Sequence, residues 1–375
     1  MTTQTDPAGT ERFITAPMSA CLDLIRFAAA LTVLIFHSVQ AQLYIGPFLP
    51  PSMAQHNAVV VFFVLSGLVI TTSVQRRHGK LHNFALARAA RIVPAALIAI
   101  GFGTAAFLLA KFIGAPPQHF DQWGDFSLRA IVMPMLFMSE SPWGSGPLWN
   151  PPFWSLCYEV WYYALFGAAV FLRGWQRAAW LVVFAILAGP KVLLMLPVWL
   201  IGVALALAPF ARRCGWKAGL VWLIAGLALC LYQTTLVNEG RLLTLQLFSA
   251  MGVKPGFSQF ALTDLLLGIG VAAVFIGLRP LVSRWPRVWL SLDPLARALA
   301  GFSFTLYLFH WPLLLLIKTF NLTAGTNLPA FAVLLLGMTL TCYGISFVTE
   351  RQRDVVRRWA KYSVLHLGEV RARRA

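Results

Sequence analysis

The amino-acid sequence predicts an all-α protein, a bundle of helices that crosses a membrane many times. Of its 375 residues, 59% are hydrophobic and only 11% are charged, whereas a soluble chain of this size would carry about 25% charged residues. The mean hydropathy is +0.72. Long apolar runs follow one another with short gaps. We therefore expect one membrane domain rather than several soluble ones.

The apolar runs predict ten membrane spans. They lie at 22–42, 57–75, 92–112, 153–172, 178–189, 191–210, 219–236, 261–279, 301–319 and 330–349. The fifth and sixth runs are separated by little more than Gly189-Pro190, which leaves barely enough room for a turn. A further apolar run at 128–139 contains Arg129 and Pro134. At about twelve residues it is short for a span, so we interpret it as re-entrant or interfacial.

The distribution of Lys and Arg indicates the orientation. Ten spans place both termini on one side, and 24 of the 30 Lys and Arg residues then fall on that side. Because basic residues are enriched in cytoplasmic loops, both termini are predicted to be cytoplasmic. Counting 128–139 as a span would scatter this asymmetry. We expect a cytoplasmic tail at 1–18, a membrane domain at 19–351 and a basic cytoplasmic tail at 352–375.

Several classes of protein are disfavoured by the same composition. The net charge of +17 does not indicate nucleic acid, because the basic residues form short clusters between apolar runs. The five cysteines are scattered without a C-x-x-C pair, so neither a disulfide framework nor a metal site is predicted. Residues 1–20 contain no apolar signal region, so the first span itself should direct insertion.

The first span carries three ionisable side chains on one face. At about 100° per residue, His37 lies about 20° from Arg26 and about 40° from Asp23 around the helix. Ionisable groups are costly in lipid, so this stripe should face the bundle interior or a cavity, where it is a candidate functional site. The alternative is that Asp23 and Arg26 pair at the helix entry and that His37 bonds a neighbouring helix.

A second candidate site begins the fourth span, at Trp154 and Ser155, and continues through Glu159 to Tyr162 and Tyr163. Glu159 and His37 are predicted to lie about 9 Å and about 8 Å below the outer ends of their spans, so they can meet. A carboxylate beside a histidine fixes its tautomer and stabilises the imidazolium, which would make His37 a general base. A purely structural Glu–His or Glu–Tyr pair is the alternative.

Four further ionisable residues stand out. Arg88 and Arg91 share a helical face just before the third span, in a pattern that suits bidentate binding of phosphate. Basic residues are expected at a cytoplasmic span end in any case. His310 lies inside a span, where a histidine needs a reason. Glu350, at the inner end of the last span, could pair with any cytoplasmic arginine.

These segments resemble motifs of the membrane acyltransferase 3 family. In chain order the matching segments are Leu22 to His37, Phe62 to Gly67, Arg88-x-x-Arg91 before Pro94, Trp154 to Glu159 with Tyr162-Tyr163, Leu306 to Pro312, and Glu350. They cover about residues 19–351. Two positions depart from the family pattern: Val160 replaces a second acidic residue, and Arg351-Gln352 replaces the usual Lys/Arg-Pro. Neither touches the proposed catalytic pair.

The resemblance implies a ten-span enzyme that moves an acyl group, often acetyl, from cytoplasmic acyl-CoA to a hydroxyl. Acceptors in the family are mostly sugars of cell-surface or exported glycans. The Tyr158-Glu159 pair is most similar to the exopolysaccharide-modifying branch. The resemblance also implies catalytic roles for His37 and Glu159, donor binding by Arg88 and Arg91, no permanently bound cofactor, and a bacterial plasma (inner) membrane location.

The resulting hypothesis is acyl transfer across the membrane. The coenzyme A phosphates would bind Arg88 and Arg91, and the pantetheine arm would thread beside Asp23, Arg26 and His37. His37 would deprotonate an acceptor hydroxyl arriving from outside, and Glu159 would orient His37. Direct attack and an acyl-histidine intermediate both stay open.

Two rival functions share these features. A transporter or flippase of a lipid-linked or secreted polar solute would also bury ionisable groups. A sensor or assembly subunit could keep the fold and lose the chemistry, although the intact His37 and Glu159 argue against it.

Overall fold

The computed structural model describes residues 12–77, 79–114 and 126–352. Most of each predicted tail therefore lies outside the described residues. Within them the chain is helical, with no strand beyond a single bridge between Tyr44 and Gly325. The α-helices are α1 (Ala16–Gln40), α2 (Ala54–Arg77), α3 (Leu81–Phe112), α4 (Arg129–Met135), α5 (Trp154–Phe171), α6 (Gly174–Leu207), α7 (Pro209–Arg212), α8 (Trp216–Tyr232), α9 (Val237–Ala250), α10 (Ala261–Arg284), α11 (Pro286–Ala300), α12 (Ser303–Thr319) and α13 (Leu328–Ile345). The described residues also include the short 3₁₀ turns η2 (Pro151–Phe153), η3 (Gln233–Leu236), η4 (Gly256–Phe260) and η5 (Glu350–Gln352).

Local sequence explains where two of the long helices begin. The Thr15 side chain accepts a hydrogen bond of 3.3 Å from the Met18 amide at the start of α1. The Asn327 side chain does the same for the Ala330 amide at 2.9 Å at the start of α13. Both helices also carry a proline in their first turn, where the missing N–H leaves no bond unmade.

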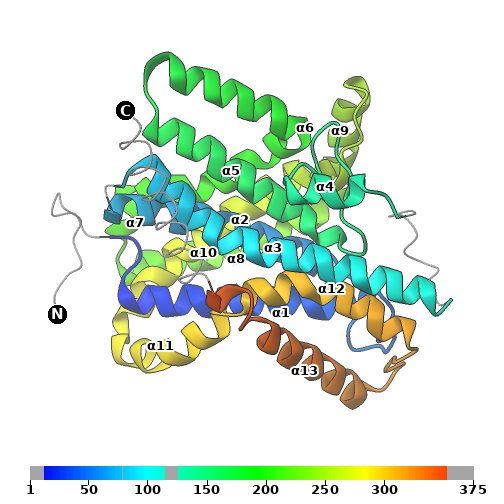
Figure 1. Ribbon diagram of the computed structural model, residues 1–375. Coiled ribbons are helices and arrows are strands. Elements are labelled where there is room, and N and C mark those ends of the chain that lie inside the picture. The colour runs from blue at the N-terminus through cyan, green and yellow to red at the C-terminus, as the bar shows by residue number, and fades with distance from the viewer. Residues whose placement is uncertain (1–11, 78, 115–125, 353–375) are drawn as a thin grey trace, which may run out of the picture.

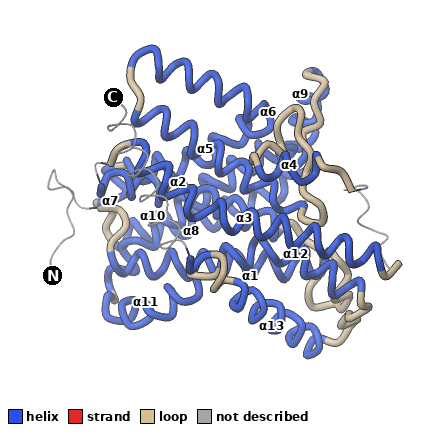
Figure 2. The backbone as a smooth tube through the Cα atoms, in the orientation of Figure 1, coloured by secondary structure: helices blue, strands red, loops and turns tan. Residues whose placement is uncertain are grey.

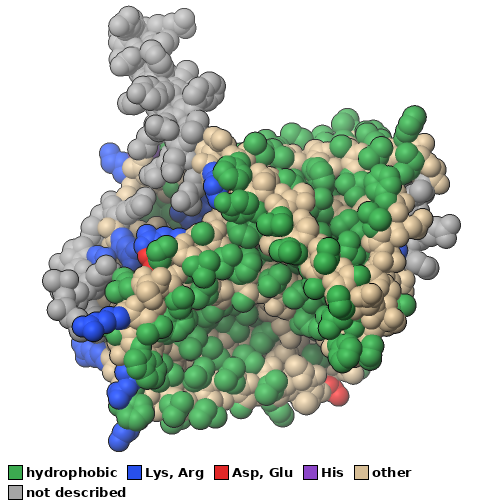
Figure 3. Space-filling model, turned by 90° about the horizontal axis from the view of Figure 1, so that it is seen from below, with side chains coloured by type: hydrophobic (Ala, Val, Ile, Leu, Met, Phe, Trp, Pro, Cys, Tyr) green, Lys and Arg blue, Asp and Glu red, His purple; other side chains and the backbone are tan. Residues whose placement is uncertain are grey.

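The described chain is a multi-pass membrane protein. Eight helical stretches are long and apolar enough to cross a bilayer: Ala16–Gln40, Ala54–Arg76, Leu81–Phe112, Gly174–Leu207, Trp216–Ala250, Gly256–Arg284, Pro286–Thr319 and Leu328–Gln352. Figure 2 shows these helices connected by loops that gather toward the two ends of the bundle. In Figure 3 apolar side chains cover most of the visible face, and Lys and Arg gather at one end. Figure 1 shows α7 and α11 at that basic end, and α4 and α9 at the opposite one.

The long helix α6 is a hairpin of two arms. Gly189 breaks it, with φ of 80° and ψ of 173°. The first arm starts where α5 ends and runs back along it, so that Phe184 contacts Trp161 near the start of α5. The second arm returns, and Trp199 packs on Phe166 farther along α5. The turn lies at the predicted place, and positive φ explains why a glycine occupies it.

Two segments between the long helices do not cross the bundle. The run 128–139 forms only α4, whose seven residues extend about 10 Å and cannot span a bilayer. The exclusion of this run from the predicted spans is thus confirmed. The helix α11 was not predicted from the sequence. It packs against α1 and buries Ala296 and Ala300 while leaving its Arg297 side chain exposed.

Helix neighbours determine which side chains can meet. The helix α1 packs against α2, α11 and α12, whereas α5 packs mainly against α6 and also contacts α2 and α3. The helices α2 and α6 approach closely because Gly67 and Gly202 have no side chain. A Cβ at Gly67 would collide with the Trp199 carbonyl oxygen, and one at Gly202 with the Val64 carbonyl oxygen. The helix α2 thus stands between α1 and the α5–α6 pair.

Candidate active site

Two cavities lie one behind the other along α2 and α12. The arginine cavity is lined by Arg26, Ser66, Arg91, Glu159 and their neighbours. The histidine cavity is lined by His37, His56, Trp154, Phe260, Trp311 and others. Val59 and Tyr307 line both cavities. The two spaces therefore meet at these two side chains.

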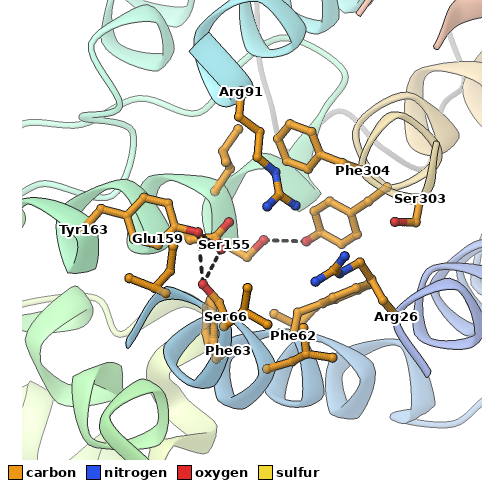
Figure 4. Close-up of a pocket in the computed structure, with 16 residues that line it drawn as sticks. Arg26, Phe62, Phe63, Ser66, Arg91, Ser155, Glu159, Tyr163, Ser303 and Phe304 are labelled. Carbon is orange, nitrogen blue, oxygen red and sulfur yellow. Dashed lines mark hydrogen bonds between the residues drawn. The ribbon is translucent and has the colours of Figure 1, made fainter. Parts of the chain in front are cut away.

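The arginine cavity brings together guanidinium groups from different helices. Figure 4 shows Arg26 of α1 and Arg91 of α3 pointing into the same space, with Glu159 of α5 facing them. Asp23 and Arg26 form an ion pair at 3.0 Å, which is the structural alternative that the sequence left open for these two residues. Arg26 and Arg91 also interact electrostatically with Glu159 and with Glu350. Two cations thus converge on one cavity, and carboxylates surround them.

Hydrogen bonds hold Glu159 in place. Its Oε1 accepts from the Ser66 hydroxyl at 2.6 Å and from the Tyr163 hydroxyl. The Ser66 and Tyr163 hydroxyls are themselves 3.0 Å apart, and the Trp199 indole N–H donates to Ser66 at 3.2 Å. This network fixes the carboxylate on the side of the cavity that faces Arg91. Glu159 therefore balances charge in the arginine cavity.

Arg88 does not share this cavity with Arg91. It lines a separate apolar groove between α3, α5 and α6, together with residues such as Phe84 and Trp180. Tyr163 borders both spaces, so it lies between the two arginines. The sequence predicts that Arg88 and Arg91 share a helical face and bind phosphate as a pair. In the structure both residues belong to α3, but their side chains line different spaces.

A chain of hydrogen bonds fixes the tautomers of two histidines in the histidine cavity. His310 Nδ1 lies 2.6 Å from the Tyr307 carbonyl oxygen, which can only accept, so Nδ1 carries the proton. His310 Nε2 then has a lone pair and can only accept a hydrogen bond, and it lies 2.8 Å from His37 Nδ1. His37 Nδ1 must donate, which leaves His37 Nε2 unprotonated in the neutral ring. Trp311 supports the His37 ring edge to face at 4.8 Å.

His37 therefore has a different partner from the one predicted. The predicted meeting of His37 with Glu159 is wrong, because Glu159 bonds Ser66 and Tyr163 in the arginine cavity while His37 bonds His310 in the histidine cavity. Depth along a helix axis does not determine lateral neighbours. The helix α1 packs on α12, which supplies His310, and α5 lies on the far side of α2. His310 itself is fully buried.

The other predicted site residues divide between structural and cavity positions. Tyr162 is buried and donates to the Val192 carbonyl at 2.9 Å, so it supports the α5–α6 contact. Trp154 lines the histidine cavity and stacks on Phe257 at 4.7 Å. Ser155 lines the arginine cavity and bonds the Tyr307 hydroxyl at 2.6 Å.

Glu350 lies near the arginine cavity without lining it. Its Oε2 accepts from the Thr305 amide and from the Thr305 hydroxyl, each at 3.0 Å. It interacts electrostatically with Arg26 and Arg91, whereas the pairing with a cytoplasmic arginine that the sequence allows stays a prediction. The hydrogen bonds tie the end of the last helix to the start of α12.

Sequence reasoning missed a histidine–aspartate pair in the histidine cavity. His56 Nε2 lies 3.0 Å and 2.9 Å from the two carboxylate oxygens of Asp264. The side chains come from α2 and α10, 208 residues apart. One signal could have found them, because Asp264 is an acidic residue inside a predicted span, and such residues are candidates by default. Among the described residues, no group of three His, Cys, Asp or Glu could hold a metal ion.

Comparison with known proteins gives one match. A family model described as an acyltransferase domain matches residues 19–347, which include every residue that lines the two cavities. No curated protein and no solved structure matches the chain.

Proposed function

The chain belongs to the acyltransferase 3 family and is a membrane acyltransferase, and from this premise we propose that it moves an acetyl group from acetyl-CoA to a hydroxyl of an exported or cell-surface glycan. The observation that supports this proposal most strongly is the hydrogen-bond chain from the Tyr307 carbonyl through His310 to His37. It leaves a histidine lone pair at a cavity wall, which is what a general base requires.

The donor occupies the arginine cavity in this proposal. Acyl-CoA is polyanionic, and guanidinium groups bind phosphates strongly through charge-assisted hydrogen bonds. Arg26 and Arg91 point into this cavity from two helices. The thioester then reaches the boundary at Val59 and Tyr307, where the two cavities meet. Tyr307 is one helical turn from His310, so His37 lies close to that boundary.

The acceptor occupies the histidine cavity. Its wall combines the aromatic side chains of Trp154 and Trp311 with the amides of Gln40, Gln55 and Gln259. An aromatic lining with a few well-placed polar groups is a combination that accommodates a neutral polar ring. This lining supports a sugar as the acceptor.

The transfer then balances as follows. The acceptor hydroxyl gives its proton to His37 Nε2 while its oxygen forms a bond to the thioester carbonyl carbon. The carbon–sulfur bond breaks, and His37 returns the proton to the departing coenzyme A thiolate. The same lone pair could instead take the acyl group first: a bond forms between the carbonyl carbon and Nε2 while the carbon–sulfur bond breaks. The acceptor oxygen then attacks the same carbon, the carbon–Nε2 bond breaks, and the acceptor proton passes to the coenzyme A thiolate. Rapid quenching with labelled acetyl-CoA separates the routes, since only the second gives labelled protein.

We further propose ten spans with both termini cytoplasmic, in a bacterial plasma membrane. Adding α5 and counting both arms of α6 raises the eight apolar stretches to ten. The concentration of Lys and Arg at one end of the bundle supports a cytoplasmic assignment for that end.

An assay in detergent tests the enzymatic proposal against transport. The purified protein should release coenzyme A from acetyl-CoA in micelles when a glycan acceptor is added. A transporter or flippase needs a sealed vesicle to show activity, so turnover that appears only in vesicles would contradict the proposal.

A further inference from the structure

The histidine–aspartate pair of His56 and Asp264 has no role in the proposed acyl transfer. His56 is 7% exposed and Asp264 is 2% exposed. The His56 ring lies near-parallel to Trp154 with centroids 6.1 Å apart, and Phe260 contacts it edge to face at 5.0 Å. With Asp264 at Nε2, the ring is held on three sides. Such a fixed ring is preorganised for a contact in the cavity that it lines.

The hydrogen bonds of His56 leave one nitrogen for the cavity. A carboxylate only accepts hydrogen bonds, so Nε2 carries a proton toward Asp264. In the neutral ring Nδ1 then has a lone pair, and within the described chain it has no hydrogen-bond partner. His56 also lines the histidine cavity. The cavity thus presents two fixed imidazole lone pairs, on His37 Nε2 and on His56 Nδ1.

Both lone pairs lie next to the boundary between the cavities. His56 is one helical turn from Val59, and His310, which holds His37, is one turn from Tyr307. Val59 and Tyr307 are the residues that both cavities share. His37 and His56 are also close enough to interact electrostatically. An acceptor placed for reaction at His37 therefore has His56 within the same site.

We propose that His56, oriented by Asp264, binds a second hydroxyl of the acceptor, so that the enzyme selects polyhydroxylated acceptors and directs which hydroxyl is acylated. The inference rests on the proposed function. His37 accepts the proton of the reacting hydroxyl, and His56 Nδ1 accepts a hydrogen bond from a neighbouring one. His56 is a positioning residue for the acceptor and takes no proton in the reaction.

Two substitutions separate the two nitrogens of His56. His56→Gln can keep a donor for Asp264 but has no atom at the position of Nδ1. His56→Asn can place its amide oxygen near the position of Nδ1 but is too short to reach Asp264. The loss of one neutral hydrogen bond should raise the acceptor KM about 2- to 10-fold in the Gln variant. Its kcat and its acetyl-CoA KM should stay within about twofold of the unmodified protein, and the Asn variant should lose less acceptor affinity.

The experiment uses the full-length protein in detergent with acetyl-CoA and two kinds of acceptor. One is the cell-surface glycan fraction of the producing cells, and the other is methyl β-D-glucopyranoside with its four monodeoxy analogues. The unmodified protein should lose rate with one deoxy analogue beyond the one that lacks the acylated hydroxyl. That extra loss should vanish in His56→Gln. Glu140→Gln is the matched control, because Glu140 is a buried carboxylate paired with Lys191 outside both cavities, and it should change neither value.

Two results would overturn the inference while the proposed function stands. One is an unchanged acceptor KM in His56→Gln with either acceptor. The other is a collapse of kcat with unchanged KM, which would make His56 a base. If the unmodified protein transfers acetyl to no hydroxyl, the proposed function itself fails.

Discussion

At the scale of single residues, function depends on which ring nitrogens carry protons. The sequence identifies His37 and His310 as histidines within spans, but they lie 273 residues apart, and no local pattern pairs them. The sequence led us to expect a histidine paired with a carboxylate, at His37 and Glu159. The structure contains such a pair, but it is formed by His56 and Asp264. Pairings between distant helices depend on lateral packing, which periodicity within one helix does not contain.

His310 should act through His37. His310→Ala removes the acceptor for His37 Nδ1–H, so the His37 ring can rotate or change tautomer. Loss of the base itself should lower kcat by about 10²–10⁴-fold, and the loss in His310→Ala should be smaller. His310→Gln can place an oxygen near Nε2 and should retain more activity. Steady-state kinetics at saturating acetyl-CoA measures both. Equal losses in the Ala and Gln variants would argue against a role in fixing the tautomer.

Arg91 and Arg88 should differ in donor binding. Arg91 faces the arginine cavity and Arg88 faces the apolar groove. Arg91→Ala should weaken acyl-CoA binding by about 1.5–3 kcal/mol, the value of a charged hydrogen bond. Arg91→Lys should rescue it only partly, because a point charge replaces a planar fork. Titration calorimetry with a non-reactive acyl-CoA analogue gives the comparison, and a larger loss in Arg88→Ala would contradict the assignment.

At the scale of elements, apolar runs predict the long helices well and amphipathic ones poorly. The predicted spans fall on helices in the right order, and the turn at Gly189 lies where Gly-Pro indicates it. The helix α11 was missed because Arg287, Asp293 and Arg297 interrupt its apolar positions, so no run of span length exists there. A helix that covers one side of a bundle needs only one apolar face.

The close contact of α2 with α6 should be sensitive to added volume. Gly202→Val inserts a branched side chain against the Val64 carbonyl oxygen and should destabilise the protein by about 1–3 kcal/mol. Gly337→Ala is the control, because its Cβ meets nothing within 4 Å. Thermal unfolding in detergent reports both. An unshifted Tm in Gly202→Val would mean that the two helices are farther apart than described.

At the scale of the whole molecule, charge and cavities run along the same axis. In our proposal the arginine cavity takes the polyanionic donor and the histidine cavity takes the neutral acceptor. The distribution of Lys and Arg predicts the orientation of the bundle. Hydropathy alone predicts the membrane bundle. It predicts no cavity, because a cavity is formed by helices that the sequence separates, as α1, α2, α5 and α12 do here.

Topology can be tested at the two ends of α6. If α6 is a hairpin, cysteines placed at Gln176 and at Arg213 in a cysteine-free background lie on the same, cytoplasmic side. Both should resist an impermeant thiol reagent in intact cells, whereas a cysteine at Lys254 should react. Labelling at Arg213 with protection at Gln176 would mean that α6 crosses the membrane once.

The relation between the cavities predicts how double mutants combine. His37 and His310 form one unit, so His37→Ala with His310→Ala should be hardly slower than His37→Ala alone. His37 and Glu159 lie in different cavities, so the losses in His37→Ala and Glu159→Gln should multiply. Rates of acetyl transfer by the three single variants and the two double variants decide this. If the losses in His37→Ala and Glu159→Gln do not multiply, the two residues act together, which would contradict their placement in separate cavities.

The most direct test of the central claim is the rate of acetyl transfer by His37→Ala, measured together with its acyl-CoA affinity. If His37 Nε2 is the base, the rate should fall by about 10²–10⁴-fold while donor affinity at Arg26 and Arg91 is retained. A folded His37→Ala protein that transfers acetyl at the normal rate would contradict the account.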